Sequence, residues 1–121
     1  MSRREAFDPQ ATIFKNDKVK LAEWIMGPVE GDITEVPGVG PKTKDVLADA
    51  GITTTYQLFG QFLSLKSVDC SGSVELCDRF WYYLEKIGTP AGFRSTIVQS
   101  VACKLDASYP GLYDSEMFPT T

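Results

Sequence analysis

Residues 36–51, VPGVGPKTKDVLADAG, decide how this chain folds. Two glycines flank a single apolar residue, Val39, so the backbone can turn tightly just before a helix begins. Pro41 is preset for the first turn of that helix, and Gly51 stops it. The stretch therefore predicts a helix-hairpin-helix element.

The bend before Lys42 is the part of this element that carries chemistry. Backbone amides at a helix N-terminus have no partner within the helix, and the partial positive charge there favours an anion. With Lys42 and Lys44 beside the bend, a nucleic-acid phosphate is the expected anion, and such a contact reads the backbone and not the base sequence. Gly38 and Gly40 would permit close approach of the phosphate, while Val39 would tuck into the interior. The interpretation fails if the bend is buried with its nitrogens already bonded.

Apolar residues recur at helical spacing on both sides of the hairpin. We expect helices over residues 18–26, 41–50, 54–64, 74–87 and 90–107, with a short helical turn after Asp32 and a polar loop over 67–73. The residues expected on the apolar faces are Val19, Leu21, Ala22, Ile25, Met26, Val46, Leu47, Ala50, Tyr56, Leu58, Phe59, Phe62, Leu63, Phe93, Ile97, Val98, Val101, Ala102 and Leu105. Five helices with short connections predict a compact all-α domain.

The chain of 121 residues has the length of one domain, with a different pattern at each end. Residues 1–16 have little periodicity and are predicted to form an extended N-terminal arm, with Phe7, Ile13 and Phe14 as anchors. Residues 17–107 form the predicted helical domain. Residues 108–121 form an irregular, acidic C-terminal arm.

Composition narrows the class of protein further. With 43% apolar and 23% charged residues, the chain can bury a core, and it has neither an apolar run of about 18 residues nor the apolar segment of a secretory signal. We therefore expect a nuclear or cytoplasmic protein that does not contact a membrane. The cysteines Cys70, Cys77 and Cys103 are odd in number without CxxC spacing, and histidine is absent, so neither disulfides nor a zinc site nor another cofactor is expected.

The net charge of −4 limits how strongly the chain can attract DNA from a distance, and most of the excess acid lies in residues 105–121. A local cluster of basic residues can still bind phosphate despite the negative net charge. Without histidine, no serine or cysteine nucleophile can rely on a histidine base, and no paired carboxylates show a recognisable pattern. We expect a protein that is not an enzyme.

The segment after the hairpin narrows the interpretation to one family. Residues 56–66, YQLFGQFLSLK, resemble the segment that follows the hairpin in the barrier-to-autointegration factor family. Upstream, Leu21-Ala22-Glu23 and Met26-Gly27 resemble that family's first helix and the turn after it. Downstream, an aromatic helix, a glycine and a last helix follow in matching order, so the resemblance extends from residue 18 to about residue 107.

The resemblance implies a five-helix fold, a homodimer with two DNA-binding faces, sequence-independent bridging of duplex DNA, and nuclear chromatin or envelope partners. By position it implies a hairpin contact and a second phosphate contact at the start of the last helix, where Arg94 stands near the place of a family lysine. With Lys44 from the hairpin, the candidate DNA-binding residues are Gly38, Val39, Gly40, Lys42, Thr43, Lys44, Ala91, Gly92 and Arg94.

Two alternatives remain open from the sequence. Aromatic residues around Trp81 could stack on single-stranded nucleic acid, although aromatic runs in an amphipathic helix usually form a core or a dimer interface. The chain could also be a structural adaptor that docks onto protein partners through its arms, for example in a ciliary or other cytoskeletal scaffold. The candidate partner-binding residues are Phe7, Phe14, Trp81, Tyr82, Tyr113 and Phe118.

Overall fold

The computed structural model describes residues 6–118. Its α-helices are α1 (Lys18–Met26), α2 (Pro41–Asp49), α3 (Thr55–Ser64), α4 (Ser73–Ile87) and α5 (Ala91–Ser108). The short 3-10 helices are η1 (Pro9–Ala11), η2 (Ile33–Glu35) and η3 (Ser115–Met117). Within these residues there is no strand, only an isolated bridge between Asp32 and Thr54. The prediction of an all-α, five-helix domain is confirmed.

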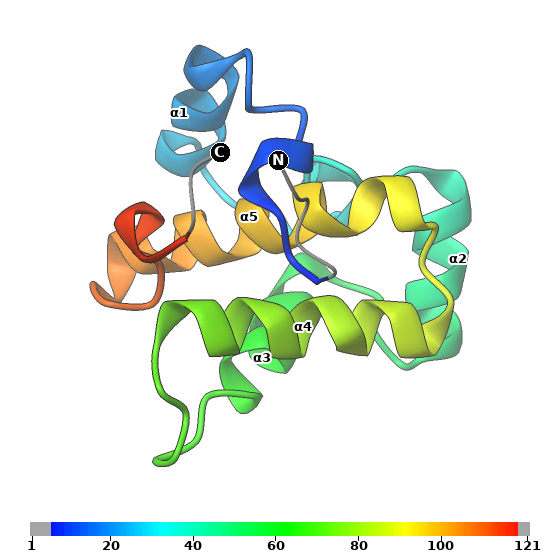
Figure 1. Cartoon of the computed structure of the whole chain (residues 1–121). Helices are drawn as coiled ribbons and strands as arrows, with labels where there is room; N and C mark the ends of the chain where they lie inside the picture. Colours follow the sequence, from blue (N-terminus) through cyan, green and yellow to red (C-terminus); the bar gives the residue numbers. More distant parts are fainter. Residues whose placement is uncertain (1–5, 119–121) are drawn as a thin grey trace.

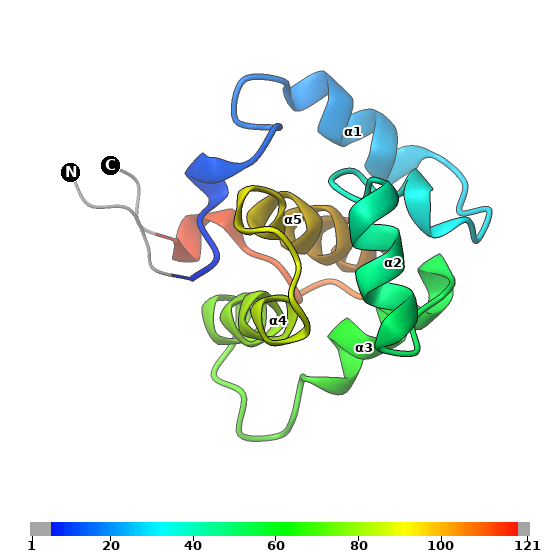
Figure 2. The ribbon, with the colours of Figure 1, turned by 90° about the vertical axis from the view of Figure 1, so that its right-hand side faces the viewer.

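Helix α5 is the centre of the domain, and the other elements surround it (Figures 1 and 2). It contacts α4, α1, α3 and η1. From Ser95 to Leu105 every residue but Cys103 is buried. A helix that is covered on nearly all sides forms the core itself and does not lie on its surface. The hairpin itself meets this helix at Gly38, which lies against Thr96 and Ile97.

Local sequence signals fix the helix ends. Asp17 caps α1 by accepting a hydrogen bond from the Lys20 amide at 3.0 Å. Thr54 and Gln57 form a reciprocal capping box at the start of α3. Gly88 ends α4 in the left-handed conformation, with φ of 95°. The expected helices are confirmed to within about two residues, as is usual for helix ends.

Several residues expected on apolar faces are exposed. These are Val19, Ala22, Met26, Ala50, Tyr56 and Phe93. Tyr56 lies on the surface, where its hydroxyl donates a hydrogen bond to the Val29 carbonyl at 3.1 Å. Instead of Ala50 and Tyr56, the β-branched Thr43 and Thr55 are buried on α2 and α3. The helical spacing correctly predicted where the helices lie. Which side chains of each helix are buried depends instead on how the helix packs in the domain.

The described parts of the two expected arms, residues 6–16 and 108–118, pack against the helices and are not free. Phe7 lies in the core, and its ring meets that of Phe118 edge to face, with centroids 5.1 Å apart. The Asp8 amide donates a hydrogen bond to the Ser95 hydroxyl at 3.0 Å. On the C-terminal side, the Asp114 amide donates to the Ser73 hydroxyl at 2.9 Å. Residues 1–5 and 119–121 of the expected arms lie outside the described residues.

Candidate nucleic-acid interface

The hairpin is a tight bend between η2 and α2. The Val39 amide donates a hydrogen bond to the Val36 carbonyl at 3.0 Å. The side chains of both valines are buried, as expected for Val39. Gly38 has a φ of +96°, and a Cβ atom there would lie 2.9 Å from Cγ1 of Ile97 on α5. Gly38 is therefore needed for two reasons, since its backbone is left-handed and it touches the central helix.

Gly40 differs from Gly38 because it is open to solvent. It is the N-cap of α2 with φ of −100° and ψ of −170°, a conformation that any residue adopts, and a Cβ atom there would meet nothing within 4 Å. No side chain caps the helix. The glycine that permits close approach of a ligand is thus Gly40, whereas Gly38 holds the bend on α5.

Three amides of the bend lack a hydrogen-bond partner among the described residues. The first hydrogen bond of α2 runs from the Lys44 amide to the Gly40 carbonyl at 2.9 Å. Within residues 6–118, the amides of Gly40, Lys42 and Thr43 donate no hydrogen bond. Gly40 and Lys42 are exposed, whereas Thr43 is buried. The amides of Gly40 and Lys42 therefore lie at an uncovered helix N-terminus, and the condition that would have excluded an anion site does not arise.

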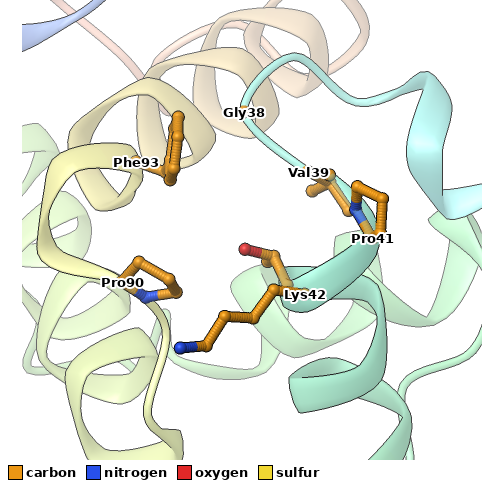
Figure 3. Close-up of a pocket in the computed structure, with 8 residues that line it drawn as sticks. Gly38, Val39, Pro41, Lys42, Pro90 and Phe93 are labelled. Atoms are coloured by element: carbon orange, nitrogen blue, oxygen red, sulfur yellow. The ribbon is translucent and has the colours of Figure 1, made fainter.

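A pocket of about 380 Å³ opens beside this bend (Figure 3). Pro90, the N-cap of α5, lies across from Lys42, so the pocket separates the N-termini of two helices. Phe93 projects from the first turn of α5 on another side of the same space. The lining residues are Gly38, Val39, Gly40, Pro41, Lys42, Thr43, Pro90 and Phe93.

The two lysines of the hairpin are separated. Lys42 lines the pocket, whereas Lys44 does not and lies close enough to Asp32 to influence its charge. Hydrogen bonds from the Thr34 side chain and amide lower the pKa of Asp32, and the positive charge of Lys44 contributes in the same direction. Lys42 is therefore the hairpin cation that lines the pocket, whereas Lys44 lies on the side of α2 near Asp32.

At the start of α5 the backbone amides are unbonded, whereas the nearby cation, Arg94, is already engaged by other residues. Ala91 and Gly92 are exposed, and their amides donate no hydrogen bond within the described residues. The Arg94 guanidinium donates to the Thr89 carbonyl at 2.8 Å, lies 3.7 Å from a Glu85 carboxylate oxygen and stacks over the Trp81 ring at 5.0 Å. In this conformation Arg94 is turned toward α4 and away from the pocket.

The residues proposed for protein partners are mostly occupied within the domain. Phe7, Phe14 and Phe118 are buried, and Tyr113 packs against Phe7 and Phe118. Trp81 contacts Arg94 and Tyr82. Among the six residues proposed for protein partners, only Tyr82 is well exposed. Most of these aromatic side chains therefore pack within the domain, and their binding to a protein partner stays a prediction.

The site residues predicted from the sequence omit three residues of the pocket, Pro41, Pro90 and Phe93. The helical spacing placed Phe93 with the buried face of α5, but its side chain is 49% exposed. The available signal was position: Phe93 lies in the first turn of α5, before the buried run that starts at Ser95. A side chain there extends beyond the helices that cover the rest of α5.

The packing of Gly38 gives a testable prediction. Gly38→Ala should lower the free energy of unfolding by about 2 kcal/mol or more, because it combines a left-handed backbone with a clash on Ile97. The matched variant Gly40→Ala should cost less than about 1 kcal/mol, the loss of a preferred N-cap residue. Urea unfolding of both proteins measures the difference, and equal losses would contradict this account of the bend.

These features define a class of protein, a small helical domain built around an open helix-hairpin-helix element. The family model described as barrier to autointegration factor matches residues 14–72, a segment that contains α1, η2, α2 and α3. The resemblance to this family is thus confirmed over these residues, and the family consists of non-enzymatic DNA-binding proteins. Comparisons with curated proteins and with solved structures give no match.

Two further findings concern the described part of the chain. None of its helices is both long enough and apolar enough to cross a membrane. Nor do residues 6–118 gather three or more cysteine, aspartate or glutamate side chains into a group that could hold a metal ion.

Proposed function

We propose that this chain is a non-enzymatic module that binds duplex DNA through its phosphate backbone without reading the base sequence. One observation carries the proposal: the amides of Gly40, Lys42 and Thr43 are unbonded at an exposed bend beside the Lys42 side chain. A phosphate oxygen would accept the hydrogen bonds that the helix leaves open, and the helix end and Lys42 supply positive charge. The family match over residues 14–72 supports the same function.

The N-terminus of α5 is the proposed second phosphate contact. Pro90 lines the hairpin pocket, whereas Ala91 and Gly92, whose amides are open, line a separate pocket with Asp8 and Trp81. The two helix ends would therefore hold different phosphates. With Arg94 held by Thr89 and Glu85, this second contact depends on backbone amides.

Bridging of two DNA duplexes is what the family resemblance implies, and it needs more than one copy of the chain. We propose that two copies form a homodimer whose two hairpin faces hold separate duplexes, and that the protein acts in the nucleus. Retention of a labelled duplex on an immobilised one, in the presence of the protein, would test bridging.

The unequal placement of the two lysines makes the proposal testable. Lys42→Glu should weaken binding to duplex DNA by roughly tenfold at low salt and should flatten the salt dependence by about one counterion, because one phosphate contact is lost. Lys44→Glu makes the same change in net charge two residues away and should have a clearly smaller effect. Mobility-shift titrations over a salt series measure both.

Two results would reject the proposal. One is the absence of any duplex binding by the parent protein at low salt. The other is an equal loss in the Lys42 and Lys44 variants, which would point to a general effect of net charge and not to contact at the pocket.

A further inference from the structure

The pocket beside the hairpin has features that a phosphate alone does not use. Phe93 exposes half of its ring there, and Val39, Pro41 and Pro90 add further apolar lining. Figure 3 shows Phe93 and Lys42 projecting into the same space from different helices. A phosphate is fully charged and gains nothing from an aromatic ring, so this wall suits a ligand that also has an apolar part.

A polar group in the pocket also lacks a partner. Thr43 is 2% exposed and lines the pocket, yet its hydroxyl makes no hydrogen bond within residues 6–118. It is not one of the fully enclosed polar atoms without a partner, which among the described residues are Thr89 Oγ1 and Gln99 Oε1, so its small exposed surface opens onto the pocket. Because a nearly buried hydroxyl is normally hydrogen-bonded, it suits a ligand that brings a donor or an acceptor to this point, independently of the helix N-terminus.

The size of the pocket limits the ligand. Its volume of about 380 Å³ exceeds what a phosphate needs and lies at the lower end of the range of small-molecule sites, which begins at roughly 300 Å³. A nucleotide combines an anion, hydrogen-bonding edges and a flat ring face in one unit of this size. In an intact duplex the ring faces are stacked on one another, so only an unpaired nucleotide offers all three.

We infer that the pocket holds one unpaired nucleotide, with its phosphate on the amides of Lys42 and Thr43 and its base against Phe93. This inference rests on the proposed function and names the form of DNA preferred at the same site: duplex with a single-stranded overhang over blunt duplex. Stacking on an aromatic side chain tolerates any base, so the preference does not depend on sequence.

The experiment compares a blunt duplex with the same duplex carrying a short 3′ or 5′ overhang, using fluorescence anisotropy. The parent protein should bind one of the overhang duplexes roughly tenfold more tightly than the blunt one. Phe93→Ala should remove that ratio, since the ring that stacks on the base is gone. Tyr109→Ala, which removes an exposed aromatic ring at the C-cap of α5, should leave the ratio unchanged.

A base analogue whose fluorescence is quenched by stacking, placed in the overhang, gives a second readout. Its signal should fall on binding to the parent protein and to Tyr109→Ala, and stay high with Phe93→Ala. Equal affinity for blunt and overhang duplexes, or a ratio that survives Phe93→Ala, overturns the inference while leaving duplex binding intact. Failure to bind any of the duplexes overturns the proposed function and this inference together.

Discussion

Gly40→Asp is expected to weaken DNA binding strongly while leaving the domain folded. An aspartate at this N-cap would accept hydrogen bonds from the amides of Lys42 and Thr43, the same donors that we assign to phosphate. Its negative charge would also repel the DNA backbone. Affinity for duplex DNA should fall by at least about tenfold at low salt, whereas stability should stay equal or rise by a few tenths of a kcal/mol, as for a gained helix cap.

Two companion variants separate the causes. Gly40→Ser offers a neutral cap and should give a smaller loss of affinity than Gly40→Asp. Ala48→Asp adds the same charge on the exposed surface of α2, near its other end, and should bind DNA nearly as well as the parent protein. Mobility-shift and urea-unfolding measurements on the set are sufficient. Retained binding by a folded Gly40→Asp would mean that the hairpin amides do not contact DNA.

Lys104→Met should cause the largest loss of stability, about 2 to 4 kcal/mol. The Lys104 ammonium donates to the carbonyls of Trp24, Ile25 and Gly27 at 2.7, 3.2 and 2.7 Å. It also lies 4.7 Å from the centre of the Trp24 ring, and the residue is only 8% exposed. Burial lowers the pKa of Lys104, and the negative charge of Glu35 opposes this shift. Methionine would fill the space but leave three carbonyls without a donor.

The effect should be concentrated on α1. This helix has no fully buried residue and no basic residue in its last turn, so Lys104 from α5 replaces the missing cap. Urea unfolding should be compared with Lys20→Met, a change on the exposed surface of α1 that should cost at most about 0.5 kcal/mol. Amide hydrogen exchange over residues 18–26 should accelerate in Lys104→Met. Equal stability of the two variants would show that Lys104 does not hold α1.

Most helix bounds followed from the sequence because their causes are local. Asp17, Thr54 and Gly88 act on amides or carbonyls within a few residues, so spacing along the chain reveals them. The hairpin was recognisable for the same reason. Which residues face the core was less predictable, since Phe93 and Tyr56 fit a helical period but point beyond the neighbouring helices.

The candidate site was only partly predictable. The sequence brought Lys42 and Lys44 together at the hairpin, but a helix rotates by about 100° per residue, so two positions apart they face different sides. Gly38 and Gly40 looked equivalent until the contact of Gly38 with Ile97 became visible. Pro90 and Phe93 reach the pocket through tertiary packing, a relation between residues 38–43 and 90–93 that no local pattern contains.

The meeting of Phe7 with Tyr113 and Phe118 has a consequence for biosynthesis. This aromatic cluster cannot close until residue 118 has emerged from the ribosome, long after Phe7 has been made. During translation the Phe7 ring must therefore stay exposed or in provisional contacts until Phe118 is available. Such distant pairing slows the last step in the folding of this domain.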